Sequence, residues 1–170
     1  MEILIAIRTF FEAGGDVLYL IALATFCMWA LIFERLWFIR TEHQEDLQEA
    51  LTYWRGRNER SSWNAQMMRQ RLISEVNLRL TQNIGFIKTL ISLLPLLGLL
   101  GTVTGMVQVF EAMTYSGGNA RSMAAGVSAA TIPTMSGMVA TLSGVLANTF
   151  LGSKVSAEEI HLEDMIAIDH

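Results

Sequence analysis

Polar side chains recur at helical spacing in a segment that carries no ionisable residue. The stretch GVSAATIPTMSGMVATLSGVLAN, residues 126–148, places Thr134, Thr141 and Asn148 at seven-residue intervals. Seven residues are close to two turns of an α-helix, so the three side chains share one helical face. Hydroxyl and amide groups on one face of an apolar helix can line a narrow passage and solvate or relay a proton.

A second uncharged stretch, around residues 90–110, carries a similar combination of residues. Thr102 shares a helical face with Pro95, whereas Ser136 and Ser143 fall on the far side of their helix from Thr134. The residues predicted to line the passage are Thr102, Thr131, Thr134, Thr141 and Asn148. Stripes of small residues adjoin them and are predicted to pack helices together: Gly98, Gly101, Gly105, Gly126, Gly137 and Gly144.

A packing role is the alternative for each of these hydroxyls. Small residues let membrane helices approach closely, and Ser or Thr can bond the carbonyls of their own helix. Pro95 and Pro133 are predicted to be kinks, since nearby hydroxyls can satisfy the carbonyl that each proline frees. A line of Thr, Thr and Asn at seven-residue spacing is nevertheless more polar than packing requires.

Catalytic chemistry finds no support in the sequence, so we expect no enzyme, no cofactor and no metal. The histidines His43, His161 and His170 are scattered, and no pair of carboxylates lies within an apolar segment long enough to span a membrane. The run GLLGTVTG lies in an apolar helix and lacks the Lys-Ser/Thr ending of a phosphate-binding loop. Cys27 is a single cysteine, which excludes a disulfide framework.

Three segments are apolar and long enough to cross a bilayer. The chain is 52% hydrophobic with a mean hydropathy of +0.38, and its uncharged stretches run over residues 17–33, 89–110 and 122–153. A span needs about 20 apolar residues. The first stretch follows Glu12 and Asp16 rather than basic residues, so it is predicted to be a span and not a secretory signal.

Basic residues predict the orientation of the spans. Between the first two spans and after the third lie Arg35, Arg40, Arg55, Arg57, Arg60, Arg69, Arg71, Arg79, Lys88 and Lys154. Only Arg8 and Arg121 lie on the other side. Because Lys and Arg accumulate on the cytoplasmic side, the N-terminus is predicted to be periplasmic and the C-terminus cytoplasmic. The basic residues form no patch with interleaved aromatics, so no nucleic acid partner is expected.

The predicted fold is an all-α integral membrane protein with three transmembrane helices. The second and third helices extend far into the cytoplasm as an antiparallel pair; unbroken, a helix from Asn64 to Phe110 would reach about 70 Å. The predicted segments are an interfacial amphipathic helix at 1–15, the first span at 16–39, a cytoplasmic loop helix at 40–63, the second extension and span at 64–111, a periplasmic turn at 112–121, and the third span and C-terminal extension at 122–170.

Three motifs resemble the ExbB/TolQ/MotA proton-channel family, most closely its ExbB branch. They are FERLWFIR at residues 33–40, LISLLPLLGLLGTVTGMVQVF at 90–110 and GVSAATIPTMSGMVATLSGV at 126–145. The resemblance covers all three spans, and the proline followed by LLGLLGTVTGM is its most specific part. Thr102 and Thr134 match the pore threonines of the family's second and third helices.

The resemblance implies a bacterial inner-membrane motor subunit. It implies a homo-oligomer, usually a pentamer, around single-span helices of an ExbD-like partner whose membrane aspartate is protonated and released. The resulting motion would energise a TonB-like protein and outer-membrane transport, and inner-membrane lipid would surround the complex. Many relatives carry a glutamate where this chain has Ala129, so the partner is expected to supply the titrating group.

Other functions remain open at this point. A TolQ-like subunit for envelope maintenance is an alternative within the family, whereas a flagellar stator subunit usually has a fourth span. A non-conducting membrane scaffold would use the glycine faces alone. A substrate transporter is disfavoured because the three spans contain no inverted repeat and no charge within the membrane.

Overall fold

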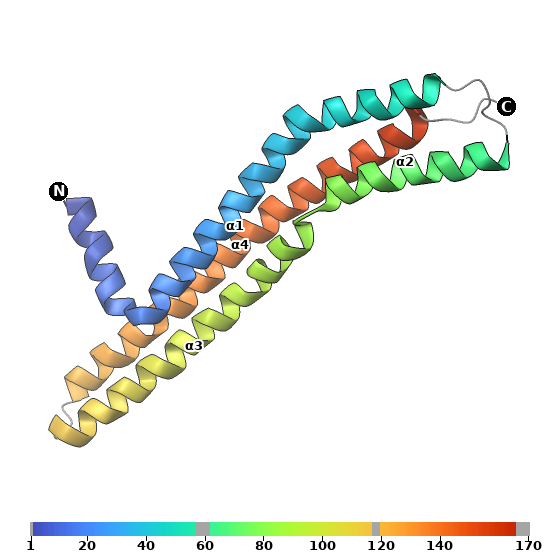
Figure 1. The fold of residues 1–170 in the computed structure, drawn as a ribbon. Coiled ribbons are helices and arrows are strands. Elements are labelled where there is room, and N and C mark those ends of the chain that lie inside the picture. The colour runs from blue at the N-terminus through green and yellow to red at the C-terminus, as the bar shows by residue number, and fades with distance from the viewer. Residues whose placement is uncertain (1, 57–61, 117–119, 166–170) are drawn as a thin grey trace. The chain divides into compact units, whose positions relative to one another are not determined.

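The structure is a computed structural model that describes residues 2–56, 62–116 and 120–165. These residues form four helices, labelled in Figure 1: α1 (Glu2–Arg55), α2 (Trp63–Thr81), α3 (Ile84–Ser116) and α4 (Ala120–Met165). Arg57, Arg60, His170 and residues 117–119 of the expected outer turn lie outside the described residues. The all-α class is therefore confirmed.

Three segments are long and apolar enough to cross a membrane, as expected. They run over Gly14–Thr41, Trp63–Tyr115 and Met123–Leu162. Most large apolar side chains along them are exposed, among them Phe26, Leu99 and Leu142. A soluble protein rarely exposes so much contiguous apolar surface, whereas a bilayer or a neighbouring subunit would cover it. The chain is an integral membrane protein.

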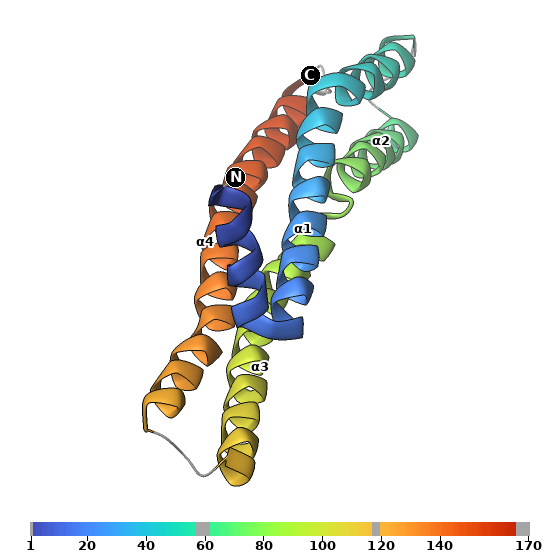
Figure 2. The ribbon, with the colours of Figure 1, turned by 90° about the vertical axis from the view of Figure 1, so that its left-hand side faces the viewer.

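Two compact units make up the chain, and helices α1, α3 and α4 each contribute to both. The first contains Met1–Trp29 and Lys88–Leu146, and the second contains Ala30–Ile87 and Ala147–His170. In the first unit α3 and α4 run antiparallel from their yellow ends in Figures 1 and 2. The first segment of α1 packs on this pair, where Met28 and Val17 contact glycines of α4 and α3.

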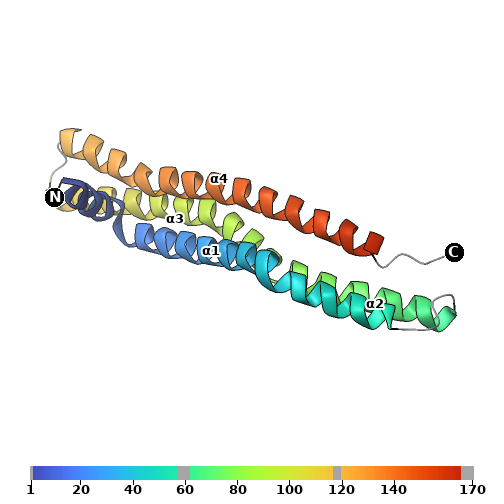
Figure 3. The same cartoon turned by 90° about the horizontal axis from the view of Figure 1, so that it is seen from above.

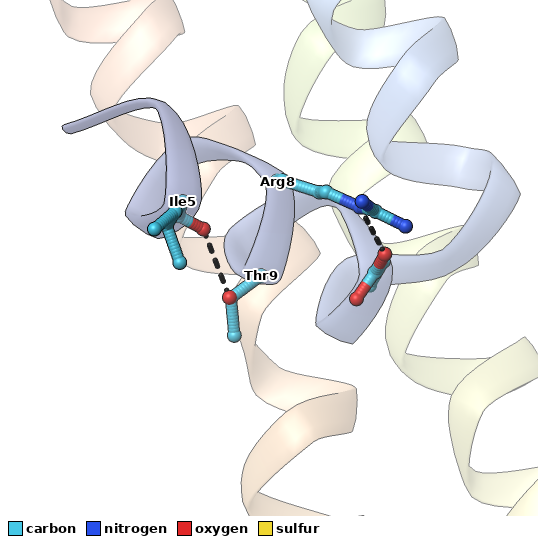
Figure 4. A network of polar contacts seen from close by, with 4 residues as sticks. Ile5, Arg8 and Thr9 are labelled. Carbon is cyan, nitrogen blue, oxygen red and sulfur yellow. Dashed lines mark hydrogen bonds and ion pairs between the residues drawn. The ribbon is translucent and has the colours of Figure 1, made fainter. Parts of the chain in front are cut away.

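Helix α1 is kinked at Gly15, where the expected interfacial helix meets the first span. Gly15 has φ 66° and ψ −167°, a conformation that only glycine adopts readily. The preceding residues form a helix that turns back from the span (Figure 1). Its polar groups bond within it: Arg8 Nε pairs with Glu12 Oε1 at 2.8 Å, and the Thr9 hydroxyl donates to the Ile5 carbonyl at 2.9 Å (Figure 4).

The second unit is built around a separate apolar core. Trp54 of α1, Val76 and Leu80 of α2, and Leu162 of α4 belong to one buried cluster. Segments of these three helices run alongside one another in Figures 1 and 3 and supply the residues of this core. Ser62 begins α2 as an N-cap, because its side chain accepts the amide of residue 65. The apolar side chains of these three helix segments therefore pack against one another.

A continuous helix from Asn64 into the second span is wrong. The structure ends α2 at Thr81 and begins α3 at Ile84. Gln82 is extended, with ψ 141°, and Asn83 has φ 65°. Asn is one of the few residues besides Gly that tolerates this left-handed conformation, so the helix is interrupted at Asn83 and not at the nearby Gly85.

Candidate functional site: the α3–α4 contact

The close approach of α3 and α4 depends on glycine at specific positions. A Cβ atom added at Gly137 would lie 2.7 Å from the backbone carbonyl oxygen of Leu94. One added at Gly98 would lie 3.0 Å from the Cα of Thr134. A Cβ at Gly101 would collide with the Pro133 ring, and one at Gly105 would lie 2.7 Å from the Ala130 Cβ. Backbone thus faces backbone across this contact.

The two remaining glycines of the predicted stripes also lie at contacts. Gly126 faces Val109 of α3, and Gly144 faces Met28 of α1 and Ile91 of α3. In contrast, a Cβ added at Gly152 would meet nothing within 4 Å. The six glycines selected from the sequence therefore mark close helix contacts, whereas this seventh glycine does not.

Thr134 bonds across the contact. Its Oγ1 donates to the carbonyl oxygen of Gly98 at 2.9 Å, and the side chain is half-buried. In an α-helix that carbonyl also accepts the amide of residue 102, so Thr134 bonds to the helical turn that carries Thr102. The two threonines expected to act together are therefore linked through one backbone carbonyl.

The other predicted hydroxyls bond to their own helices. Thr102 donates to the Leu99 carbonyl, Thr131 to Ser128 and Thr141 to Gly137, each at 2.7 Å. Ser136 and Ser143, which were placed on the far side of the helix from Thr134, bond to their own helix in the same way. Thr134 thus differs from the other predicted hydroxyls in bonding to another helix. Thr141 bonds within its own helix, as the two serines do.

Asn148 belongs to the second unit, on the continuation of α4. Its Oδ1 is buried and has no hydrogen-bond partner among the described residues. A buried amide oxygen without a partner costs free energy, so it is a candidate for a bond to water or to another chain. Asn148 was selected from the sequence because it lies seven residues after Thr141. In the structure its side-chain oxygen is free to accept a further hydrogen bond.

Both prolines lie inside uninterrupted helices. Pro95 is half-buried in α3, and Pro133 is buried in α4 against Gly101. Each lacks an amide hydrogen, so the carbonyl four residues earlier loses its helical donor. For Pro133 that carbonyl belongs to Ala129.

Ala129 lines a cavity of about 480 Å³ between the first segment of α1, α3 and α4. Thr104 and Gln108 of α3 line the same space, with Asp16 and Glu12 from α1. The small residues of both span helices leave the room for it. The chain thus has carboxylates beside Ala129, but they come from a different helix.

Substitution of Ala129 tests this placement. We expect Ala129→Glu to accumulate in membranes close to the wild-type level, because the new side chain can extend into the cavity. Ala130→Glu should lower both abundance and thermal stability, since Ala130 is 6% exposed and faces Gly105 directly. Membrane abundance and the unfolding temperature of both variants are the measurement. An equal loss in both would contradict the placement.

Arg35, one of the basic residues that predict the orientation, is buried. Arg35 is 1% exposed, and its Nη2 donates to the carbonyl of Arg79 in the second unit. The charged residues of FERLWFIR near the end of a span were the available signal. The partner of Arg35 lies 44 residues away in the sequence, so this local pattern does not reveal it. Among the described residues, no three His, Cys, Asp or Glu side chains are grouped as metal ligands.

Comparison with known proteins identifies the family of the chain. A Synechocystis sp. protein named as a putative biopolymer transport protein, ExbB-like 1, is 41% identical over 64 residues. The match covers 35% of this chain and 25% of that relative's length. Residues 38–164, which include α2, α3 and nearly all of α4, match the model of the MotA/TolQ/ExbB proton channel family. The chain therefore belongs to the MotA/TolQ/ExbB proton channel family.

Proposed function

We propose that this chain is the channel subunit of an ExbB-like energy-transducing complex in the bacterial inner membrane. With an ExbD-like partner it uses the proton motive force to energise a TonB-like protein and outer-membrane transport. The observation that carries the proposal is the Thr134–Gly98 hydrogen bond, a hydroxyl placed between two glycine-packed helices of a proton-channel family. Thr102, Thr131, Thr141 and Asn148 complete the proposed proton pathway.

The titrating group is proposed to come from the partner. Residues 89–110 and 122–153 carry no charged side chain, so the membrane faces of α3 and α4 offer hydroxyls but no acid. A membrane aspartate on a single-span helix could exchange its proton through these hydroxyls. Channel function therefore requires an assembly, for which a homopentamer around the partner is the proposed form.

Exposed apolar side chains on α3 and α4 support assembly. Leu99, Val103, Met138 and Leu142 are each more than half exposed in the isolated chain. Neighbouring subunits or the partner helix would cover such side chains in a complex, and lipid would cover the remainder.

Native mass spectrometry of the purified complex tests the assembly. We expect several copies of this chain together with a smaller single-span protein that contains a membrane aspartate. Replacement of that aspartate by Asn should abolish proton-dependent activity while the complex stays assembled. A monomer without a partner would contradict the proposal.

The proposed orientation has its own test. In a Cys27→Ser background, we expect Glu111→Cys to react with an impermeant maleimide added to spheroplasts, because Glu111 is exposed at the end of α3 proposed to be periplasmic. Ser153→Cys should react only after the membrane is opened. The reverse pattern would invert the orientation.

A non-conducting scaffold is the alternative that one observation favours. Thr102, Thr131 and Thr141 each satisfy their hydroxyls within their own helices, as a packing residue would. In a scaffold these residues would be replaceable by Ala without loss, and no partner with a membrane aspartate would co-purify. A TolQ-like role in envelope maintenance keeps the channel chemistry, and the identity of the captured partner separates it from the TonB-linked role.

A further inference from the structure

The break between α2 and α3 is held in an uncommon backbone conformation. Asn83 has φ 65°, and its carbonyl accepts the amide of Ile87 at 3.0 Å, which is the first turn of α3. A residue other than glycine at positive φ persists when its surroundings hold it there. Whatever holds Asn83 therefore also determines where α3 begins.

Arg35 of α1 contacts the α2 side of this break. Its Nη2 donates to the carbonyl of Arg79, one of the last four residues of α2. The last carbonyls of a helix are available to donors from outside it, and a positive charge is favourable at a helix C-terminus. The Phe38 ring lies 4.7 Å from the guanidinium carbon and supports its orientation.

Glu34, the preceding residue, contacts the α3 side of the break. Its Oε2 accepts a hydrogen bond from Nδ2 of Asn83 at 3.4 Å. Adjacent residues of α1 therefore bond to the end of one helix and to the residue that begins the next. All of these atoms belong to the second unit.

Stability alone does not account for Arg35. The side chain is 1% exposed, yet its Nε has no hydrogen-bond partner among the described residues. Burial of an incompletely bonded charge is costly, and an apolar side chain of similar size often stabilises a protein at least as well. The gain that Arg35 offers over such a side chain is the directed bond to the α2 terminus.

We propose that Glu34 and Arg35 are positioning residues that hold the α2–α3 break in its bent, left-handed conformation. They thereby fix the start of α3, the helix that carries Gly98 and Thr102. The role concerns backbone geometry, so it stands whether or not the complex conducts protons. Without the pair, Asn83 returns to ordinary helical or extended conformations, and the angle between α2 and the first turn of α3 becomes variable.

A hydrogen-bond exchange tests the Glu34 contact. Asn83→Asp keeps a residue that tolerates positive φ but sets its carboxylate against that of Glu34, so the contact is lost. Glu34→Gln keeps an acceptor for Asn83 and should behave like the wild type. In the double variant the amide introduced by Glu34→Gln can donate to the carboxylate introduced by Asn83→Asp, so the contact should return. If Asn83 mattered only because Asn tolerates positive φ, Asn83→Asp would give the same distance distribution as the wild type.

Spin-label distances across the break provide the readout. Labels at Gln66→Cys and Phe86→Cys, both exposed, are placed in the full-length chain in nanodiscs with Cys27→Ser. A straight helix would separate these positions by about 30 Å along its axis. The wild type and Glu34→Gln should give one narrow, shorter distribution; Asn83→Asp should give a longer distribution that is about twofold wider.

Arg35→Met and its matched control complete the test. Arg35→Met should widen the distribution as Asn83→Asp does, and Arg35→Lys should restore part of the narrow component. Arg40→Met, which removes an exposed arginine of the same helix, should leave the distance unchanged. An unchanged distribution in Asn83→Asp, or no recovery in the double variant, would overturn the proposal. Because the Glu34–Asn83 contact is exposed, its single and double variants test the proposal even if Arg35→Met does not accumulate.

Discussion

Thr134→Val should lower proton-dependent activity by about tenfold or more, a factor that corresponds to about 1.4 kcal/mol. The substitution keeps the shape of the side chain but removes the hydroxyl that reaches the Gly98 carbonyl at 2.9 Å. Both the interhelical hydrogen bond and a polar group of the proposed proton pathway disappear together. The measurement is energised outer-membrane transport in cells that contain normal amounts of the complex.

Matched variants separate the hydroxyl from the packing around it. Thr134→Ser retains the donor and should keep most of the activity. Ser136→Ala removes a hydroxyl that bonds only to the Ile132 carbonyl of its own helix, so we expect wild-type activity. Thr102→Val should add to the loss in the Thr134→Val background. Normal activity of that double variant would rule out the proposed pathway.

Gly137→Ala should lower the unfolding free energy by about 1–3 kcal/mol, in the range of overpacked contacts. The added methyl group would lie 2.7 Å from the Leu94 carbonyl oxygen, and backbone cannot move aside as a flexible side chain can. The α3–α4 pair would have to separate along this part of the contact. Thermal unfolding of the purified complex and its membrane abundance report the effect.

Gly152→Ala is the control for this prediction. Its new methyl group meets nothing within 4 Å, and Ala is a better helix former than Gly. We expect an unchanged or slightly higher unfolding temperature. Equal destabilisation by both substitutions would contradict the role of the close contact, because Gly152→Ala introduces no such contact and should favour the helix.

The spans and their contact faces could be predicted from local patterns. Uncharged stretches reveal the spans because a bilayer penalises every charge, which acts residue by residue. Helical periodicity also selected Thr134 and the glycines Gly98 and Gly137, since close packing of two helices repeats at fixed spacing. The structure places these three residues at the same contact.

Features that depend on distant residues could not be predicted in this way. The helix break falls at Asn83 and not at the nearby Gly85. The Glu34 partner of Asn83 lies 49 residues away in the sequence. The burial of Arg35 likewise depends on α2, which a local charge count cannot reveal. The family resemblance pairs Thr102 with Thr134, although the hydroxyl of Thr102 bonds to its own helix. Whether a threonine hydroxyl bonds within its helix or to a neighbouring helix cannot be read from residue spacing.

Proton flux through the purified complex in liposomes tests the central claim most directly. With the proposed single-span partner present and a potential applied, the wild-type complex should acidify or alkalinise the lumen according to the sign of the potential. Thr134→Val should reduce this flux by about tenfold while native mass spectrometry shows the same assembly. Equal flux in the wild type and in the Thr102→Val/Thr134→Val variant, or no flux from an intact complex, would contradict the account.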